Sequence, residues 1–276
     1  PASSGATAPA AADRAGVGVD AYARFLDERL KSLEDLIPTM TATAQTAAKL
    51  YIDGNYDIGV IGDTGAYFEA CGRSGGLMTA RAGWSVGEIA EDKAVVLLSL
   101  REDQWRRRVH KDIVHAREQS ASGRWKVIGI GRAALLEKAE QEGVRFIAKL
   151  PIPAAEGEGL LRTGEGERVT PTSPPLKVAA MWMWFGEFVS ASTRRGEMPP
   201  MYLGYSVEGG KERAERLRGR RLHETSPPPV DAGVLARQYL QAVRADAAKL
   251  FDAERDAIVA VAAELAAAER RDGNLW

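Results

Sequence analysis

The sequence lacks the residues from which disulfides and common metal sites are built. Its 276 residues include one cysteine, Cys71, and three histidines, which excludes an internal disulfide and a zinc site made of several thiolates. His110 and His115 are five residues apart, and that spacing does not bring two side chains well onto one face of a helix. We therefore expect no metal ion and no other cofactor.

Long apolar runs and an excess of one charge are also missing. The densest apolar stretch covers only residues 178–185, far fewer than the roughly 18 apolar residues that a membrane-spanning helix needs. Lys and Arg total 37 against 38 Asp and Glu, for a formal net charge of -1, whereas a dedicated nucleic-acid-binding protein is normally basic. We expect neither a membrane nor a nucleic acid as partner.

Composition divides the chain into three parts. Residues 1–18 are rich in Ala, Ser, Pro and Gly and are predicted to be a flexible segment. The chain does not start with Met, so this segment is interpreted either as a linker left after removal of a signal peptide or as a trimmed start. Residues 19–226 are predicted to be one α/β domain, and residues 227–276 a Pro-rich linker with an Ala-rich helical segment. A cytoplasmic location is slightly favoured over export.

Apolar residues in the middle part alternate between two periods. A stripe at steps of three and four predicts a first helix from Tyr22 that ends at Pro38, and an Ala-rich second helix continues as far as Gly54. Short apolar runs typical of buried parallel strands occupy residues 57–62, 94–98, 126–130, 144–148 and 201–205. Helical patterns occupy residues 66–78, 105–120, 133–142 and 177–195. This alternation predicts a three-layer α-β-α sandwich around a mainly parallel sheet.

The helical stretch at residues 177–195 is apolar almost all round, with tryptophan, methionine and phenylalanine in succession from 181 to 185. Such a helix is buried on more than one side. One sheet face covers only part of that surface, so we expect an isologous homodimer to cover the rest.

The order of these elements, with a few local strings, resembles the sugar isomerase (SIS) domain family over residues 22–206. The string Ile58-Gly59-Val60-Ile61-Gly62-Asp63-Thr64-Gly65 is similar to the first strand and turn of that family. The strand at 94–98 runs into Ser99, and Glu187 lies in the late helix. An Ala-rich helix before Asp272-Gly273-Asn274, like the one before Asp53-Gly54-Asn55, is either the start of a second such unit or a coincidence among Ala-rich helices.

The resemblance implies a sugar phosphate as small-molecule partner, in bacterial carbohydrate-derivative metabolism. It implies a ligand site at the carboxyl ends of the strands, from Gly62, Thr64, Gly65 and Ser99, with Glu187 as the base of an aldose–ketose isomerisation. In that family the second loop is rich in hydroxyl groups. The corresponding string here is Ser99-Leu100-Arg101-Glu102-Asp103-Gln104, and only Ser99 matches the family pattern. Arg101 could hold phosphate by charge instead.

Three functions therefore stay open. The first is a phosphosugar-binding protein with a divergent phosphate loop, and the second is an active isomerase that uses Glu187. The third is a non-catalytic structural or interaction protein whose sheet domain supports oligomerisation. A carboxylate satisfied by neighbouring groups is the alternative interpretation of Glu187.

Overall fold

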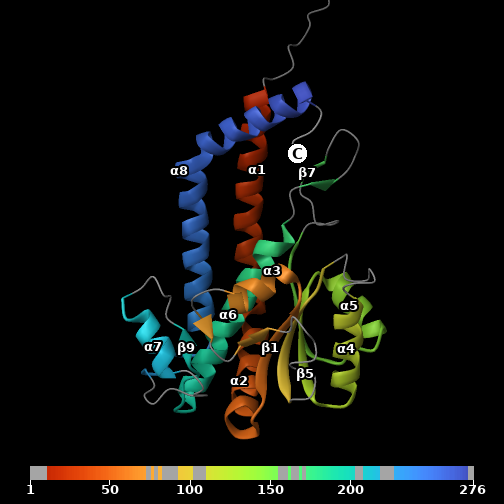
Figure 1. The fold of residues 1–276 in the computed structure, drawn as a ribbon, viewed down its shortest axis with the longest axis vertical. Helices are drawn as coiled ribbons and strands as arrows, with labels where there is room; N and C mark the ends of the chain where they lie inside the picture. Colours follow the sequence, from red (N-terminus) through yellow and green to blue (C-terminus); the bar gives the residue numbers. More distant parts are fainter. Residues whose placement is uncertain are drawn as a thin grey trace, which may run out of the picture.

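In the computed structural model the residues described are 11–72, 76–77, 80–82, 93–101, 110–154, 161–162, 168–169, 172–202, 208–217 and 227–272. A five-stranded sheet in the order β3-β1-β4-β5-β6 forms the centre of the molecule (Figure 1). Its strands are β1 (Asp57–Gly62), β3 (Ala80–Ala82), β4 (Ala94–Ser99), β5 (Trp125–Gly131) and β6 (Phe146–Pro151). All four neighbouring pairs are parallel, which confirms the α/β class and the parallel sheet.

Helices cover both faces of this sheet. On one face lie α2 (Ile37–Gly54) and α6 (Ser173–Arg194), and on the other lie α4 (His110–Ala121) and α5 (Ala133–Gln141). Successive residues of β4 alternate between two separate cores: Val95 and Leu97 pack in the first, Val96 and Leu98 in the second. This alternation gives the sheet two apolar faces, as a layer between two helical layers requires.

The prediction of a main-sheet strand at residues 201–205 is wrong for its described part. Met201 and Tyr202 form β9 (Met201–Tyr202), which pairs antiparallel with β2 (Gly76–Leu77) outside the main sheet. The remaining residues of that stretch lie outside the described part. The fifth strand of the main sheet is instead β3, which is too short for periodicity to reveal. A second short antiparallel pair joins β7 (Leu161–Arg162) to β8 (Arg168–Val169).

The predicted helix at residues 66–78 is also shorter than expected. It consists of α3 (Thr64–Tyr67) and one π-helical turn, η2 (Phe68–Gly72), and by Gly76 the chain is already a strand. The φ angle of Gly76 is +107°, and a Cβ atom there would lie 2.6 Å from the ring of Trp182. The close approach of that ring and the left-handed backbone both require glycine at this position.

The late helix α6 is buried by its own chain. Trp184 stacks on Phe188 with ring centroids 5.7 Å apart, and its indole Nε1 donates a 3.1 Å hydrogen bond to Thr43 of α2. The neighbours of α6 include α2, α3, β5 and α8 (Val234–Asp272). The apolar surface from which we expected a dimer is therefore covered within one chain.

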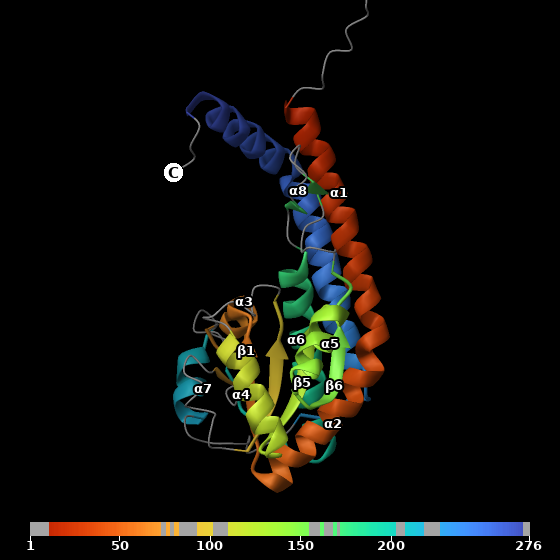
Figure 2. The ribbon, with the colours of Figure 1, turned by 90° about the vertical axis from the view of Figure 1, so that its right-hand side faces the viewer.

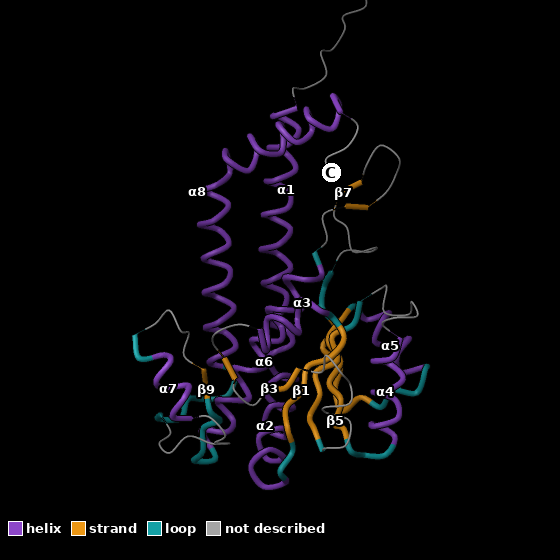
Figure 3. The backbone as a smooth tube through the Cα atoms, in the orientation of Figure 1, coloured by secondary structure: helices purple, strands orange, loops and turns teal. Residues whose placement is uncertain are grey.

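Two long helices form a stalk that extends beyond the sheet. Helix α1 (Ala11–Lys31) and the 39-residue α8 lie side by side in opposite directions (Figures 1 and 2). The main sheet lies in the other part of the molecule, whereas the short strand β7 lies at the height of the stalk (Figure 3). The first helix begins at Ala11 rather than Tyr22, so part of the segment expected to be flexible is helical. A 3₁₀ turn, η1 (Ser32–Leu36), joins α1 to α2, and Pro38 lies in the first turn of α2, where its missing N–H has no cost.

The C-terminal segment is a single helix that bends within its upper half (Figure 2). A second unit like the one in the resemblance would begin with two helices and continue as a strand at Leu275-Trp276. The segment is instead one helix, and Leu275-Trp276 lies outside the described residues. A short helix, α7 (Gly210–Leu217), precedes the Pro-rich linker. Among the described helices none is long and apolar enough to cross a membrane.

Gly129 of β5 tests the packing of α5 and β6 against the sheet. A Cβ atom at this position would lie 2.4 Å from Leu136 and 2.8 Å from the ring of Phe146. We expect Gly129→Ala to lower the free energy of unfolding by about 1–3 kcal/mol, measured by urea denaturation. Ile147→Ala on the half-exposed face of β6 is the control and should change stability by less than about 0.5 kcal/mol. An unchanged stability in Gly129→Ala would contradict this packing.

Candidate functional site

The order of the strands creates one switch point, the place where ligands of open α/β sheets usually bind. From β1 the chain passes to β3 on one side and then to β4 on the other, so the strand order reverses between β1 and β4. At such a switch point the loops after the two strands diverge and leave a crevice at their carboxyl ends. Here Gly62 and Ser99 are register partners, and the Asp63 N–H donates a 2.9 Å hydrogen bond to the Ser99 carbonyl.

A buried ion pair lies at this carboxyl edge. The Lys177 side chain is 1% exposed, and its Nζ donates hydrogen bonds to Oδ2 of Asp63 and, at 3.3 Å, to the carbonyl oxygen of Leu100. The other oxygen of Asp63 accepts a 2.8 Å hydrogen bond from the N–H of Gly65. One lysine on α6 thus binds the loops that come after β1 and β4, and its charge balances that of Asp63.

This pair was missed from the sequence. In the sequence Asp63 is a negative charge within the turn expected to bind phosphate, and no neighbouring residue offsets it. The available signal was Lys177 itself, a cation between Leu176 and Val178 at the start of an otherwise apolar helix. A charge in that position is buried only if it is paired, but nothing in the local pattern says with which residue.

Most of the predicted ligand residues lie at this edge. Gly62 ends β1 with a φ angle of +99°, Thr64 is the first residue of α3, and Gly65 binds the Asp63 carboxylate through its N–H. Ser99 ends β4 and is buried. Arg101, half-buried, comes directly after Leu100 at the beginning of the next loop.

Glu187 is not directed to the strand ends. Its buried carboxylate accepts hydrogen bonds from the backbone N–H groups of Gly233 at 2.7 Å and Ala236 at 3.1 Å, and from the Thr41 hydroxyl at 3.1 Å. Gly233 comes directly before α8 and Ala236 lies in its first turn, where the N–H groups have no partner within the helix. Glu187 therefore caps α8. Since 187 − 177 = 10 residues separate it from Lys177 on α6, the two side chains start about 15 Å apart along the helix.

The histidines of α4 serve separate contacts. The ring Nε2 of His110 lies 3.1 Å from a carboxylate oxygen of Glu142, while the ring of His115 packs against Trp125 with centroids 5.3 Å apart. Burial lowers the pKa of His115. Within the described part of the chain, no cluster of three or more His, Cys, Asp or Glu residues is arranged to hold a metal ion.

We compared the chain with protein families and with curated proteins. No protein-family model matches the chain, and no curated protein matches its sequence. The candidate site therefore stands on its geometry and on the chemistry of its residues.

Replacing Glu187 separates a capping role from a catalytic one. In Glu187→Ala two backbone N–H groups and one hydroxyl lose a buried acceptor, so we expect the free energy of unfolding in urea to fall by about 2–4 kcal/mol. Glu187→Gln keeps one acceptor oxygen and should lose less. Glu118→Ala, on the exposed face of α4, is the control. A residue needed only as a base would leave the stability of Glu187→Ala near that of the control.

Proposed function

We propose that this chain binds a small phosphorylated ligand, of the sugar-phosphate class, at the carboxyl ends of β1 and β4. The observation that carries the proposal is the buried Lys177–Asp63 pair at the switch point of the sheet. A lone Asp63 carboxylate would repel a phosphate, but the ammonium of Lys177 cancels that charge. The edge then holds a neutral buried pair, and beside it lie the buried hydroxyl of Ser99, the half-buried Arg101 and backbone N–H groups.

Each remaining group at this edge suits part of such a ligand. The hydroxyl of Ser99 can donate to a phosphate oxygen or accept from a sugar hydroxyl. Arg101 carries a planar array of donors that matches phosphate oxygens. The glycines at 62 and 65 let the backbone approach a ligand closely, because they have no side chain in the way. These features support binding of an anion by a charge-balanced edge rather than by a hydroxyl-rich loop.

Isomerisation through Glu187 does not form part of this proposal. A base must reach the carbon-bound proton of the substrate within hydrogen-bond distance or through one water molecule. The carboxylate of Glu187 already accepts three hydrogen bonds within the core and starts about 15 Å from Lys177 along α6. We therefore infer a binding role, in which the sheet holds the sugar phosphate without converting it through this residue.

A non-catalytic interaction protein is the second candidate. The observation that favours it is the stalk of α1 and α8, which leaves apolar side chains such as Leu250 and Val261 exposed above the sheet. The two roles are compatible, because the stalk and the strand ends are separate surfaces.

Ligand binding is tested with inorganic phosphate and with hexose, heptose and amino-sugar phosphates, first by thermal shift and then by isothermal titration calorimetry. We expect at least one sugar phosphate to bind, and Ser99→Ala to weaken it about tenfold, the value of one lost hydrogen bond. Ser122→Ala, in an exposed turn, is the matched control and should bind like the unmodified protein. The proposal fails if no compound binds, or if Ser99→Ala binds as tightly as the control.

The role of Lys177 is tested by comparing single and double replacements. Lys177→Met leaves Asp63 buried without a partner, and we expect the unfolding free energy to fall by about 3–5 kcal/mol together with loss of phosphate-ligand binding. The double variant Lys177→Met with Asp63→Asn contains no buried charge and should recover most of both. Recovery of stability without recovery of binding would mean that Lys177 contacts the ligand directly rather than neutralising Asp63.

A further inference from the structure

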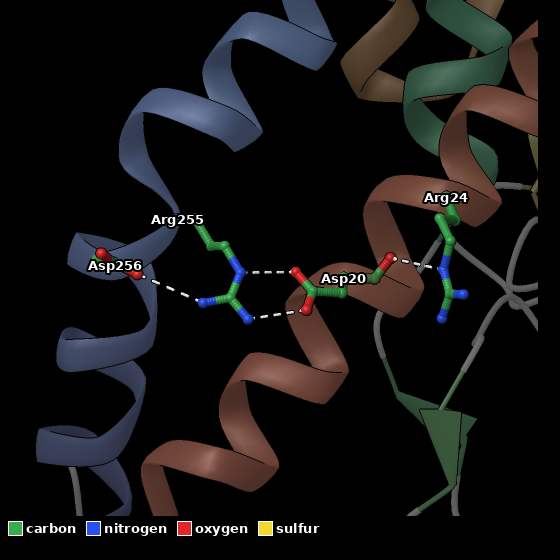
Figure 4. Close-up of polar contacts among 4 residues, drawn as sticks. All are labelled: Asp20, Arg24, Arg255 and Asp256. Atoms are coloured by element: carbon green, nitrogen blue, oxygen red, sulfur yellow. Dashed lines mark hydrogen bonds and ion pairs between the residues drawn. The ribbon is translucent and has the colours of Figure 1, made fainter.

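The two helices of the stalk are fixed to each other by paired charges. Arg255 of α8 donates two hydrogen bonds of 2.8 Å to the carboxylate of Asp20 (Figure 4), and Arg244 donates bonds of 2.7 and 3.0 Å to Asp27. These hydrogen bonds from arginine hold the pKa of both aspartates below its usual value. Between the two pairs, Phe251 packs edge-on against Tyr22 with ring centroids 6.1 Å apart. Two such pairs, in which both ends of a guanidinium bind one carboxylate, set the register of the two helices.

An apolar seam runs along α8 from the sheet domain into the stalk. It repeats at alternating steps of four and three residues, as in a coiled coil. Seven of its eight positions are apolar, and the eighth is the exposed Glu254: Ala236, Leu240, Val243, Ala247, Leu250, Glu254, Ala257 and Val261. Its first members, Ala236 and Leu240, are buried in the main core, and Val243 packs against that core. Farther along, Leu250 is 54% and Val261 59% exposed. The same seam is thus covered by the chain at its start and uncovered in its upper half.

A hollow lies beside this uncovered part. It has a volume of about 310 Å³ between α1 and α8. Three alanines and Phe251 line it together with four charged residues, Arg24, Asp27, Glu28 and Arg244. Leu250 does not line the hollow but lies one turn beyond Ala247, so a large exposed apolar side chain stands close to it. A two-fold axis would place the Leu250 of each copy in the hole of the other, since the two halves of an isologous interface are identical.

Two charged residues that line the hollow would also pair with each other across a two-fold axis. Arg24 and Glu28 line the same hollow one helical turn apart on α1 and have opposite sign. Arg24 donates only to the backbone oxygen of Asp20 among the described residues, and within that part of the chain neither side chain forms an ion pair. Two antiparallel stalks would bring Arg24 of one chain to Glu28 of the partner subunit, and the reverse pair would form at the same time.

We propose that the stalk is a homodimer interface in which each Leu250 enters the hollow between α1 and α8 of a second copy. Shape and charge on this surface complement themselves, which is the reason to assign a second copy rather than a foreign protein. The surface differs from α6, which its own chain covers. The proposal does not rest on ligand binding at the strand ends.

The oligomeric state is measured by light scattering coupled to size exclusion and by sedimentation velocity at micromolar concentration. We expect a dimer for the unmodified chain and a monomer for Leu250→Glu, with far-UV circular dichroism confirming that the variant is folded. Ile147→Glu is the control, because Ile147 is also an exposed apolar residue, 42% exposed, but lies on β6 in the sheet domain. It should stay dimeric.

A charge exchange tests the register. Arg24→Glu alone and Glu28→Arg alone place like charges together and should weaken the dimer on the order of tenfold or more. The double variant reverses both charges and should restore the dissociation constant to within about threefold of the original. A monomeric unmodified chain, a dimer that survives Leu250→Glu, or a double variant as weak as the single ones would each overturn the proposal.

Discussion

A charge in an apolar interior must be paired, and α6 carries two such charges. Lys177, near its start, pairs with Asp63 at the carboxyl end of β1, and Glu187, ten residues later, accepts the first N–H groups of α8. Neither residue could be buried alone, because desolvation of a lone charge is far more costly than the loss of a single hydrogen bond. Each therefore fixes where another part of the chain must lie. Through the first, α6 is held to the strand ends; through the second, the stalk is held to the sheet domain.

The positions of Lys177 and Glu187 also show that the predicted base and the predicted ligand site do not lie together. A late-helix glutamate and a strand-end serine suggested one catalytic centre, on the strength of a family resemblance. In the structure the two residues lie at different places. The contacts of Glu187 come from α2 and the start of α8, whereas Ser99 ends β4, opposite Gly62 and beside the Asp63–Lys177 pair. A helix start offers a carboxylate both unpaired N–H donors and a favourable dipole. These are sufficient to explain a glutamate between two phenylalanines without catalysis.

What could be predicted from the sequence is what short-range patterns encode. The strands β1, β4 and β5 and the helix α5 were found because an apolar run or a helical stripe is complete within the segment itself. The strand β3 and the pair of β2 with β9 were missed, since two or three residues have no measurable period and β9 depends on a partner strand far away in sequence. Lys177 and Asp63 are 114 residues apart, and the acceptor of the Gly233 N–H is 46 residues away. A local pattern shows that a buried charge needs a partner, but only the fold shows which one.

In the stalk, different interactions determine how α1 and α8 are aligned and how stable their contact is. The ion pairs of Asp20 with Arg255 and Asp27 with Arg244 lie in contact with solvent, where water and salt screen them, so they align the two helices more than they stabilise them. Stability has to come from apolar burial, which gives roughly 1.5–3 kcal/mol for a leucine or valine side chain that leaves water completely. In the lower half of α8 the sheet domain provides that burial. In the upper half the alignment is present and the burial is missing for Leu250 and Val261, so α1 and α8 are positioned for a contact that one chain does not complete.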